Sequence, residues 1–410
     1  MMDALPPRQL SAPPAPARPA RFETWIALPL RLAWRQLRFE KARLLAAIAG
    51  VLFACVLVFM QLGFRSALFD SATALLSAMR AELFLINPLT TASFRPEPIP
   101  RIRAHQALAL PEVAQSVPVY MAQASWRNPV DGSRRAIQLI GFDVEARAMQ
   151  FTGLEALTDS LKRADAVAFD RRSRPEFGPV ADLLREGGGS LRVQVANRLV
   201  DVVGLVDIGP SFGADGNLVL SETNFRRLLP DRLPSNTDLV AIRLAPGADV
   251  AAAQRRLREI LPPDVTVLTQ AELVAWERRY WEEATPIGFI FGFGSVMGLI
   301  VGMVIVYQIL FSDVANHLRE YATLKAIGYS DGRLSRVVLG AAMLLAVLGF
   351  VPGALLSWYL YGVVGEATFL PLAMDIGRLL GVFGMIFGMC AAAGLLAMRK
   401  LRDADPADMF

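Results

Sequence analysis

The chain has 410 residues, of which 54% are hydrophobic and 20% charged, and its formal net charge is +4. This apolar composition is typical of a membrane protein rather than a soluble one. The small excess of positive charge lies at the ends of apolar runs, not on a polar surface with interleaved aromatic side chains, so it argues against a nucleic-acid-binding protein.

The first 43 residues precede any long apolar run and divide into two parts. Residues 1–21 are rich in Pro and Ala, which predicts a disordered cytoplasmic leader. Residues 22–43 place apolar and basic side chains on different sides of a helix, which predicts an interfacial helix on the cytoplasmic leaflet. A helical extension of the first span is the alternative. The pattern consists of Leu30, Ala33, Trp34 and Leu37 against Arg31, Arg35 and Arg38.

Four stretches are long and apolar enough to cross a bilayer core of about 30 Å, which takes about 20 helical residues. They are residues 44–63, 287–311, 337–364 and 376–398. Arginine and lysine gather before the first stretch, between the second and third, and in the tail 399–410. By the positive-inside rule these segments are cytoplasmic, which places both termini inside and residues 64–285 outside.

Helical patterns continue beyond the membrane at both ends of the outside segment. Residues 64–80 keep an apolar side chain every three or four positions. Thr269 and Glu272 have the spacing of a capping box and predict a helix over 270–285. We therefore predict two helical stalks that carry the outside domain. Near the second span, Trp276, Tyr280 and Trp281 suit an aromatic belt, and Glu282 and Glu283 are interpreted as solvating the stalk.

Between the stalks the sequence predicts a mixed α/β domain. Strand patterns occur at residues 81–87, 136–142 and 191–206. A β-α-β unit follows, with strands at 238–244 and 264–269 around a helix from 249 to 261. Residues of about 151–235 are rich in Gly, Pro and charge, and are predicted to form an inserted subdomain.

No motif for catalysis or cofactor binding occurs in the sequence. It has no G-x-x-x-x-G-K-[ST] phosphate loop, no H-E-x-x-H zinc motif and no G-x-S-x-G nucleophile turn. Its two cysteines lie in apolar runs and its two histidines lie far apart, which argues against a disulfide framework and a histidine-built metal site. The interior of the spans lacks ionisable side chains that would mark an ion pathway. We therefore expect no enzyme activity, cofactor or metal in this chain.

Small residues recur at four-residue spacing in the second span, at Gly294, Gly298 and Gly302. Such a ridge lets helices approach closely, because lipid provides no hydrophobic drive for their association. The ridge fits packing within one chain and a dimer interface equally well. Four helices alone enclose little, so we expect an oligomer.

The cytoplasmic segment 312–336 has an amphipathic pattern between two spans. Val314, Leu318, Tyr321, Leu324 and Ile327 share one helical face. Gly328 supplies a left-handed stop, after which a second helix begins and continues into the third span. Such a helix either lies on the bilayer or docks into a groove of a partner protein. Only docking gives this otherwise motif-less chain a source of energy.

The stretch "EYATLKAIGYS" (320–330) resembles the coupling segment of FtsX/MacB-type ABC transporter permeases. Together with "MQLGFRSALFDS" (60–71), it is most similar to the DevC branch, and the terminal "DPADMF" resembles that family's tail. One span, a large outside domain and three further spans is also the layout of this family. The resemblance covers residues 30–410, and the chain differs from MacB in lacking a fused ATPase.

The resemblance implies a permease homodimer in the bacterial inner (plasma) membrane, driven by a separate ABC ATPase dimer that binds ATP and Mg. It implies a MacB-like periplasmic domain, a membrane-fusion adaptor and a TolC-like outer-membrane duct, with export of lipid-like or other amphipathic cargo. The ATPase-coupling residues would be Leu318, Glu320, Tyr321, Leu324, Lys325, Gly328 and Tyr329. An FtsX-like mechanotransmitter that regulates an extracytoplasmic hydrolase and a lipoprotein-extracting permease are the alternatives. The other interpretation of Tyr321 and Leu324 is burial against the ends of the neighbouring spans.

Overall fold

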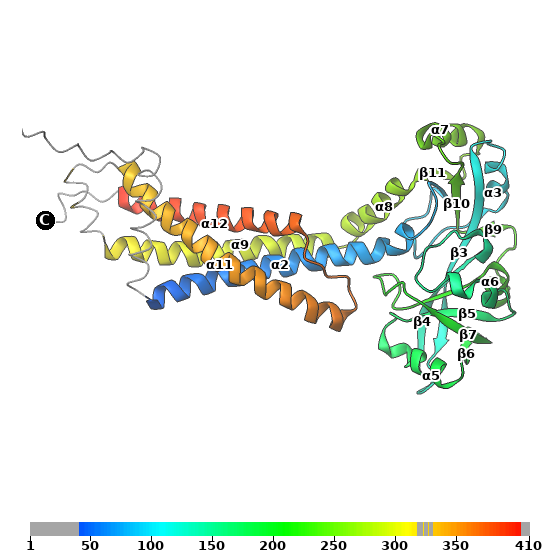
Figure 1. The fold of residues 1–410 in the computed structure, drawn as a ribbon. Helices are drawn as coiled ribbons and strands as arrows, with labels where there is room; N and C mark the ends of the chain where they lie inside the picture. Colours follow the sequence, from blue (N-terminus) through cyan, green and yellow to red (C-terminus); the bar gives the residue numbers. More distant parts are fainter. Residues whose placement is uncertain (1–40, 318–322, 324–326, 328–330, 403–410) are drawn as a thin grey trace, which may run out of the picture. The chain divides into compact units, whose positions relative to one another are not determined.

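The computed structural model describes residues 41–317, 323, 327 and 331–402 (Figure 1). The chain forms two compact units. One contains the described parts of residues 1–57, 297–355 and 379–410, and the other contains residues 58–296 and 356–378. The predicted leader and most of the predicted interfacial helix lie outside the described residues, as does the tail from residue 403.

Four helices within the described residues are long and apolar enough to cross a membrane. They are α2 (Lys41–Ser77), α9 (Ile287–Asn316), α11 (Asp331–Thr368) and α12 (Ile376–Arg402). The fold class is confirmed, because the outside domain lies between the first and second of these helices. At 1.5 Å per residue, the 37 residues of α2 span about 55 Å, well beyond a bilayer core of about 30 Å. The predicted first span and first stalk therefore belong to a single helix.

The outside domain is built on one mixed sheet of nine strands, in the order β11-β1-β10-β3-β4-β8-β5-β7-β6. The strands are β1 (Leu83–Ile86), β3 (Val113–Arg127), β4 (Arg134–Phe142), β5 (Ala166–Asp170), β6 (Leu191–Val195), β7 (Arg198–Val206), β8 (Asn217–Ser221), β10 (Leu239–Leu244) and β11 (Thr266–Thr269). A separate pair consists of β2 (Ile99–Pro100) and β9 (Asn236–Thr237).

Helices and short turns complete the domain. The α-helices are α3 (Ile102–Ala107), α4 (Thr158–Leu161), α5 (Val180–Glu186), α6 (Glu222–Leu228), α7 (Val250–Ile260) and α8 (Gln270–Arg279). Single 3₁₀ turns occupy Val144–Ala146, Glu155–Leu157 and Pro175–Phe177, and α8 continues into a π-helix over Tyr280–Ala284.

Six of the strands close into a small barrel. The sheet order runs from β3 through β4, β8, β5 and β7 to β6, and β6 pairs back onto β3 at Trp126↔Val195. The interior is apolar: Trp126 is fully buried, its ring lies 5.1 Å from that of Phe169, and its indole N–H donates to Phe177 O at 3.1 Å. The predicted insert 151–235 supplies four of these strands, and β3 and β4 precede it.

The other part of the sheet is covered on both faces. Leu83 and Leu85 of β1 pack in a cluster with residues of α3 and α7, which lie together at one face (Figure 1). Phe84 and Ile86 point the other way, into a cluster that contains Leu76 of α2 and Leu273 of α8. A strand buried on both faces needs a continuous apolar run, which explains the sequence "LFLI". The core of the outside domain thus includes the end of each stalk helix.

Candidate functional site

The predicted coupling residues Leu318, Glu320, Tyr321, Leu324, Lys325, Gly328 and Tyr329 all lie outside the described residues, and their role stays a prediction. Between residues 318 and 330 the structure describes two positions, Thr323 and Ile327. The Ile327 N–H donates to Thr323 O at 3.1 Å, which is the hydrogen bond of a helical turn. The Ile327 side chain is 72% exposed. An exposed apolar side chain on a helical turn fits both docking into a partner and contact with the bilayer surface.

Two glycines of α9, Gly294 and Gly302, lie in close helix contacts. An added Cβ at Gly302 would lie 2.5 Å from Ala54 Cβ and 2.7 Å from Met389 Sδ, on α2 and α12. In the other unit, an added Cβ at Gly294 would lie 2.5 Å from Gln61 Nε2 of α2. Gly298 is also buried. At Gly294 and Gly302 the structure therefore shows packing within one chain.

The stalk consists of the outer part of α2 and the helix α8, joined by charged pairs. Asp70 Oδ1 lies 2.7 Å from Arg278 Nη2, and Glu282 Oε1 lies 3.1 Å from Arg65 Nη2. Glu282, interpreted from sequence as solvating the stalk, thus forms an ion pair between its two helices. Each pair is exposed and contributes roughly 0.2–1 kcal/mol to stability. Because this contribution is small, the main effect of the two pairs is to fix how the two helices are aligned along their length.

The top of the stalk is capped from the α8 side. The Gln270 amide donates to Met79 O at 3.0 Å and to Ser77 O at 3.2 Å, which satisfies carbonyls at the end of α2. The predicted capping box is confirmed, because Glu272 N–H donates to Thr269 Oγ1 and Thr269 N–H donates to Glu272 Oε2. The Thr269 N–H lowers the pKa of Glu272 below its ordinary value. The stability from this bond is therefore present above the ordinary pKa and is lost as the pH falls through the lowered one.

Replacing Thr269 by alanine should destabilise the start of α8 by about 1 kcal/mol, because the N–H of Glu272 loses its acceptor. Hydrogen exchange of the backbone amides at the start of α8 measures this loss as faster exchange. Thr91→Ala, at an exposed loop position, is the control. Equal exchange in both variants would show that the box contributes nothing.

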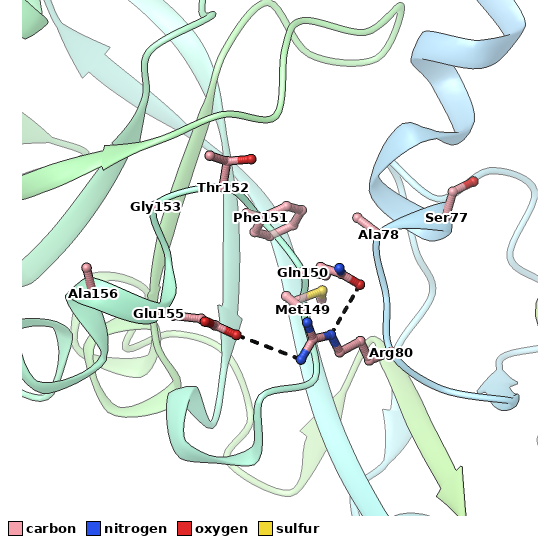
Figure 2. A pocket seen from close by; sticks show the side chains of 10 residues that line it. All are labelled: Ser77, Ala78, Arg80, Met149, Gln150, Phe151, Thr152, Gly153, Glu155 and Ala156. Carbon is pink, nitrogen blue, oxygen red and sulfur yellow. Dashed lines mark hydrogen bonds and ion pairs between the residues drawn. The ribbon is translucent and has the colours of Figure 1, made fainter.

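A cavity of about 640 Å³ lies beside the end of α2 (Figure 2). Ser77, Ala78 and Arg80 line it on one side, and the loop of residues 149–156 lines it on the other. Arg80 Nε donates to Gln150 Oε1 at 3.2 Å, and its Nη1 lies 3.8 Å from Glu155 Oε1 (Figure 2). The Arg80 guanidinium therefore binds partners within the chain and does not offer the cavity an unpaired positive charge.

The second cavity, about 380 Å³, lies between α3 and the first half of β3. Arg101 and Glu222 line it and pair with each other at 2.9 Å, and Asp143 lines it as well. Within the described part of the chain, no group of three or more His, Cys, Asp or Glu side chains could hold a metal ion. The structure also shows two stalk helices, the ion pairs that join them and the core into which their ends pack.

Two family models match the chain. The model "FtsX-like permease C-terminal" matches residues 292–406, and the model "MacB-like periplasmic core domain" matches residues 44–260. The second match alone covers more than half of the chain.

Relatives and solved structures are similar to the chain as well. Uncharacterized ABC transporter permeases of Mycobacterium bovis and Mycobacterium tuberculosis are each 23% identical over 383 residues, which is 92% of this chain and 98% of the relative. The periplasmic region of MacB from Actinobacillus actinomycetemcomitans is 12% identical with a TM-score of 0.35, over 48% of this chain and 92% of that one. The extracellular domain of the noncanonic ABC-type transporter YknZ from Gram-positive bacteria is 13% identical with a TM-score of 0.30, over 46% and 98%.

Proposed function

Because this chain belongs to the FtsX/MacB-type family of ABC transporter permeases, we propose that it is the permease half of a machine whose ATPase is a separate subunit. In this proposal two copies of the chain bind an ATPase dimer through residues 312–336. ATP binding and hydrolysis there change the positions of the stalks, and the stalks move the outside domain. ATP and Mg bind the partner, because this sequence has no phosphate loop.

The observation that carries the proposal is the construction of α2. Its 37 residues form one helix without a break, and its end packs in the core of the outside domain at Leu76. A continuous helix transmits displacement because its backbone hydrogen bonds resist bending between its ends. Asp70–Arg278 and Arg65–Glu282 join it to the second stalk helix, so both helices would move together.

We further propose that the movement serves export of lipid-like or other amphipathic cargo, with an adaptor and an outer-membrane duct as further partners. The size of the outside domain and its closed barrel support this proposal over signalling, because they offer an additional rigid surface for an adaptor. The assignment to the DevC branch, the homodimer, the inner membrane and the cytoplasmic position of both termini belong to the same proposal.

Photo-crosslinking in intact cells tests the choice among the three functions. A photoreactive amino acid is placed at Val130 or Leu199, which are 67% and 61% exposed on the barrel, and the crosslinked proteins are identified by mass spectrometry. A coiled-coil adaptor among them supports export. Crosslinks to a cell-wall hydrolase would instead support signalling, and crosslinks to lipoproteins would support extraction. Leu257, buried inside the domain, is the control position, which should give none of these three crosslinks.

A further inference from the structure

One carboxyl group of the stalk is buried without a cationic partner. Glu277 of α8 is 1% exposed. Its Oε2 accepts the backbone N–H of Ser93 at 2.8 Å, and its Oε1 accepts the indole N–H of Trp281 at 2.9 Å. Ser93 belongs to the loop of residues 87–98 between β1 and β2, far from α8 in the sequence. The carboxyl group therefore joins the stalk to a loop of the outside domain.

The electrostatics indicate that this arrangement is costly. Burial raises the pKa of Glu277, while the donors Ser93 and Trp281 act in the opposite direction. Within the described residues no cation pairs with Glu277. The neighbouring arginines of the stalk have other partners: Arg278 binds Asp70, and Arg65 binds Glu282. A glutamine or an apolar residue would pack here at lower cost in desolvation. Two N–H donors that converge on one side chain are what specifically require a carboxylate.

Aromatic rings gather at the same turn of the stalk. The Trp281 ring lies 5.6 Å from that of Phe94, the neighbour of Ser93, and 5.3 Å from that of Phe212. Phe212 belongs to the loop 207–216, which joins β7 and β8 of the barrel. The two loops also touch, because an added Cβ at Gly213 would lie 2.6 Å from Phe94 Cβ. The stalk thus contacts the barrel directly, through Trp281 and Phe212, and also through loop 87–98.

The contact lies where the stalk helix changes its geometry. Immediately after α8, residues 280–284 form a π-helix, a conformation that is rare and that occurs often at functional positions. Trp281, which is 7% exposed, lies within this turn, with Phe69 and Ala72 of α2 in the same cluster. Movement of either stalk helix would act directly on this cluster.

We propose that Glu277 is a positioning residue that fixes loop 87–98 to the stalk, so that the barrel follows the stalk when the stalk moves. This inference rests on the proposed function, because it assigns a route to the transmitted movement. Ring contacts alone permit sliding, since they are non-directional. The two hydrogen bonds to Glu277 give the contact a direction and a register.

Hydrogen exchange of the full chain in lipid nanodiscs, without any ATPase, tests the inference. Glu277→Gln leaves one acceptor for two donors and turns an amide N–H toward one of them. Backbone amides of loop 87–98 should then exchange on the order of tenfold faster, and those of loop 207–216 should follow. Glu283→Gln, at an exposed position one residue beyond the Arg65–Glu282 pair, should change neither loop.

A double variant distinguishes positioning from general loss of stability. Trp281→Phe removes the donor that binds Oε1, so the amide of a glutamine side chain at position 277 can turn its oxygen toward Ser93, whose N–H and hydroxyl are the remaining donors. The double variant Glu277→Gln/Trp281→Phe should therefore recover most of the exchange protection that Glu277→Gln loses. A double variant that is worse than either single one would overturn the assignment of Glu277.

Ser93→Pro serves where Glu277→Gln fails to fold. Ser93 is the second residue of a turn closed by the Arg95 N–H to Ala92 O bond at 3.2 Å, a position that proline favours. This variant deletes the N–H that binds Glu277 and leaves the stalk sequence unchanged. Faster exchange in loop 207–216 supports the inference, and acceleration confined to loop 87–98 would overturn the link to the barrel. Because no ATPase is present, these outcomes are independent of whether the proposed function holds.

Discussion

Replacing Gly302 by leucine should remove the folded protein from the membrane. A Cβ at this position lies 2.5 Å from Ala54 Cβ and 2.7 Å from Met389 Sδ, so α9 contacts two other helices at once. A leucine would force all three helices apart, and overpacking of this kind costs about 3 kcal/mol or more. Because lipid provides no hydrophobic drive for helix association, close van der Waals packing at this glycine holds the helices together, and a leucine removes that packing. The measurement is the fraction of monodisperse protein after detergent extraction, with its melting temperature.

Gly292→Leu is the matched control, on the same helix and ten residues earlier. No atom lies within 4 Å of an added Cβ at Gly292, so the leucine has free space within the chain. We expect this variant to extract and melt like the parent. Equal loss in both variants would contradict the packing assigned to Gly302. A Gly292→Leu chain that folds but no longer associates would place the dimer interface on this face.

Glu320→Ala and Gly328→Pro should each abolish the stimulation of the partner ATPase while leaving the permease folded. The expectation comes from the resemblance of residues 320–330 to the family's coupling segment, with Ile327 as an exposed apolar side chain on its helical turn. Proline fixes φ near −65° and removes an N–H, so it is incompatible with a left-handed helix stop at Gly328. We expect stimulation to fall at least about tenfold, to the rate of the isolated ATPase, which corresponds to about 1.4 kcal/mol of coupling or more.

The control is Glu366→Ala, which removes the same carboxyl group from an exposed position at the other end of α11. It should leave stimulation unchanged. Size-exclusion chromatography of each variant separates loss of coupling from loss of the proposed dimer. Normal stimulation in both Glu320→Ala and Gly328→Pro would show that this segment does not couple the two proteins.

The membrane helices and stalks could be predicted from sequence because their signals are local. Length and apolar content identify the spans, and the pair Thr269 and Glu272, three positions apart, marks the start of α8. The strands β1, β10 and β11 lie within predicted stretches, since each is a short run of apolar or β-branched residues bounded by turns. Strand β4 begins two residues before its predicted stretch, and the predicted stretch 191–206 forms two strands, β6 and β7.

The barrel could not be predicted because its signals are not local. Strand β3 changes its buried face along its length: Val119 and Met121 belong to the stalk-side core, and Tyr120 and Trp126 belong to the barrel core. All five residues of β5 and all five of β8 are buried, so neither strand has the alternation of apolar and polar residues that predicts a strand. The closure at Trp126↔Val195 joins residues that only the folded sheet brings together.

In the candidate site, too, the contacts that depend on the tertiary structure leave no signal in the local sequence. Trp281 was predicted to belong to an aromatic belt, and the structure shows it buried against Phe94 and Phe212. A tryptophan just before a span has the same local sequence whether its ring contacts lipid headgroups or a protein loop. Glu277 offers no signal either, because a glutamate next to the basic residues Arg278 and Arg279 on a helix is usually solvated. Only the tertiary contact with Ser93 identifies it.

The central claim is that this permease works with a separate ATPase. The most direct test is affinity purification of the tagged chain from mildly solubilised native membranes, with the recovered proteins identified by mass spectrometry and membranes from untagged cells as the control. We predict recovery of an ABC ATPase in an amount comparable to the permease, and its loss from the Glu320→Ala chain. A tagged chain that is folded and abundant but brings no ATPase from the membrane would contradict the claim.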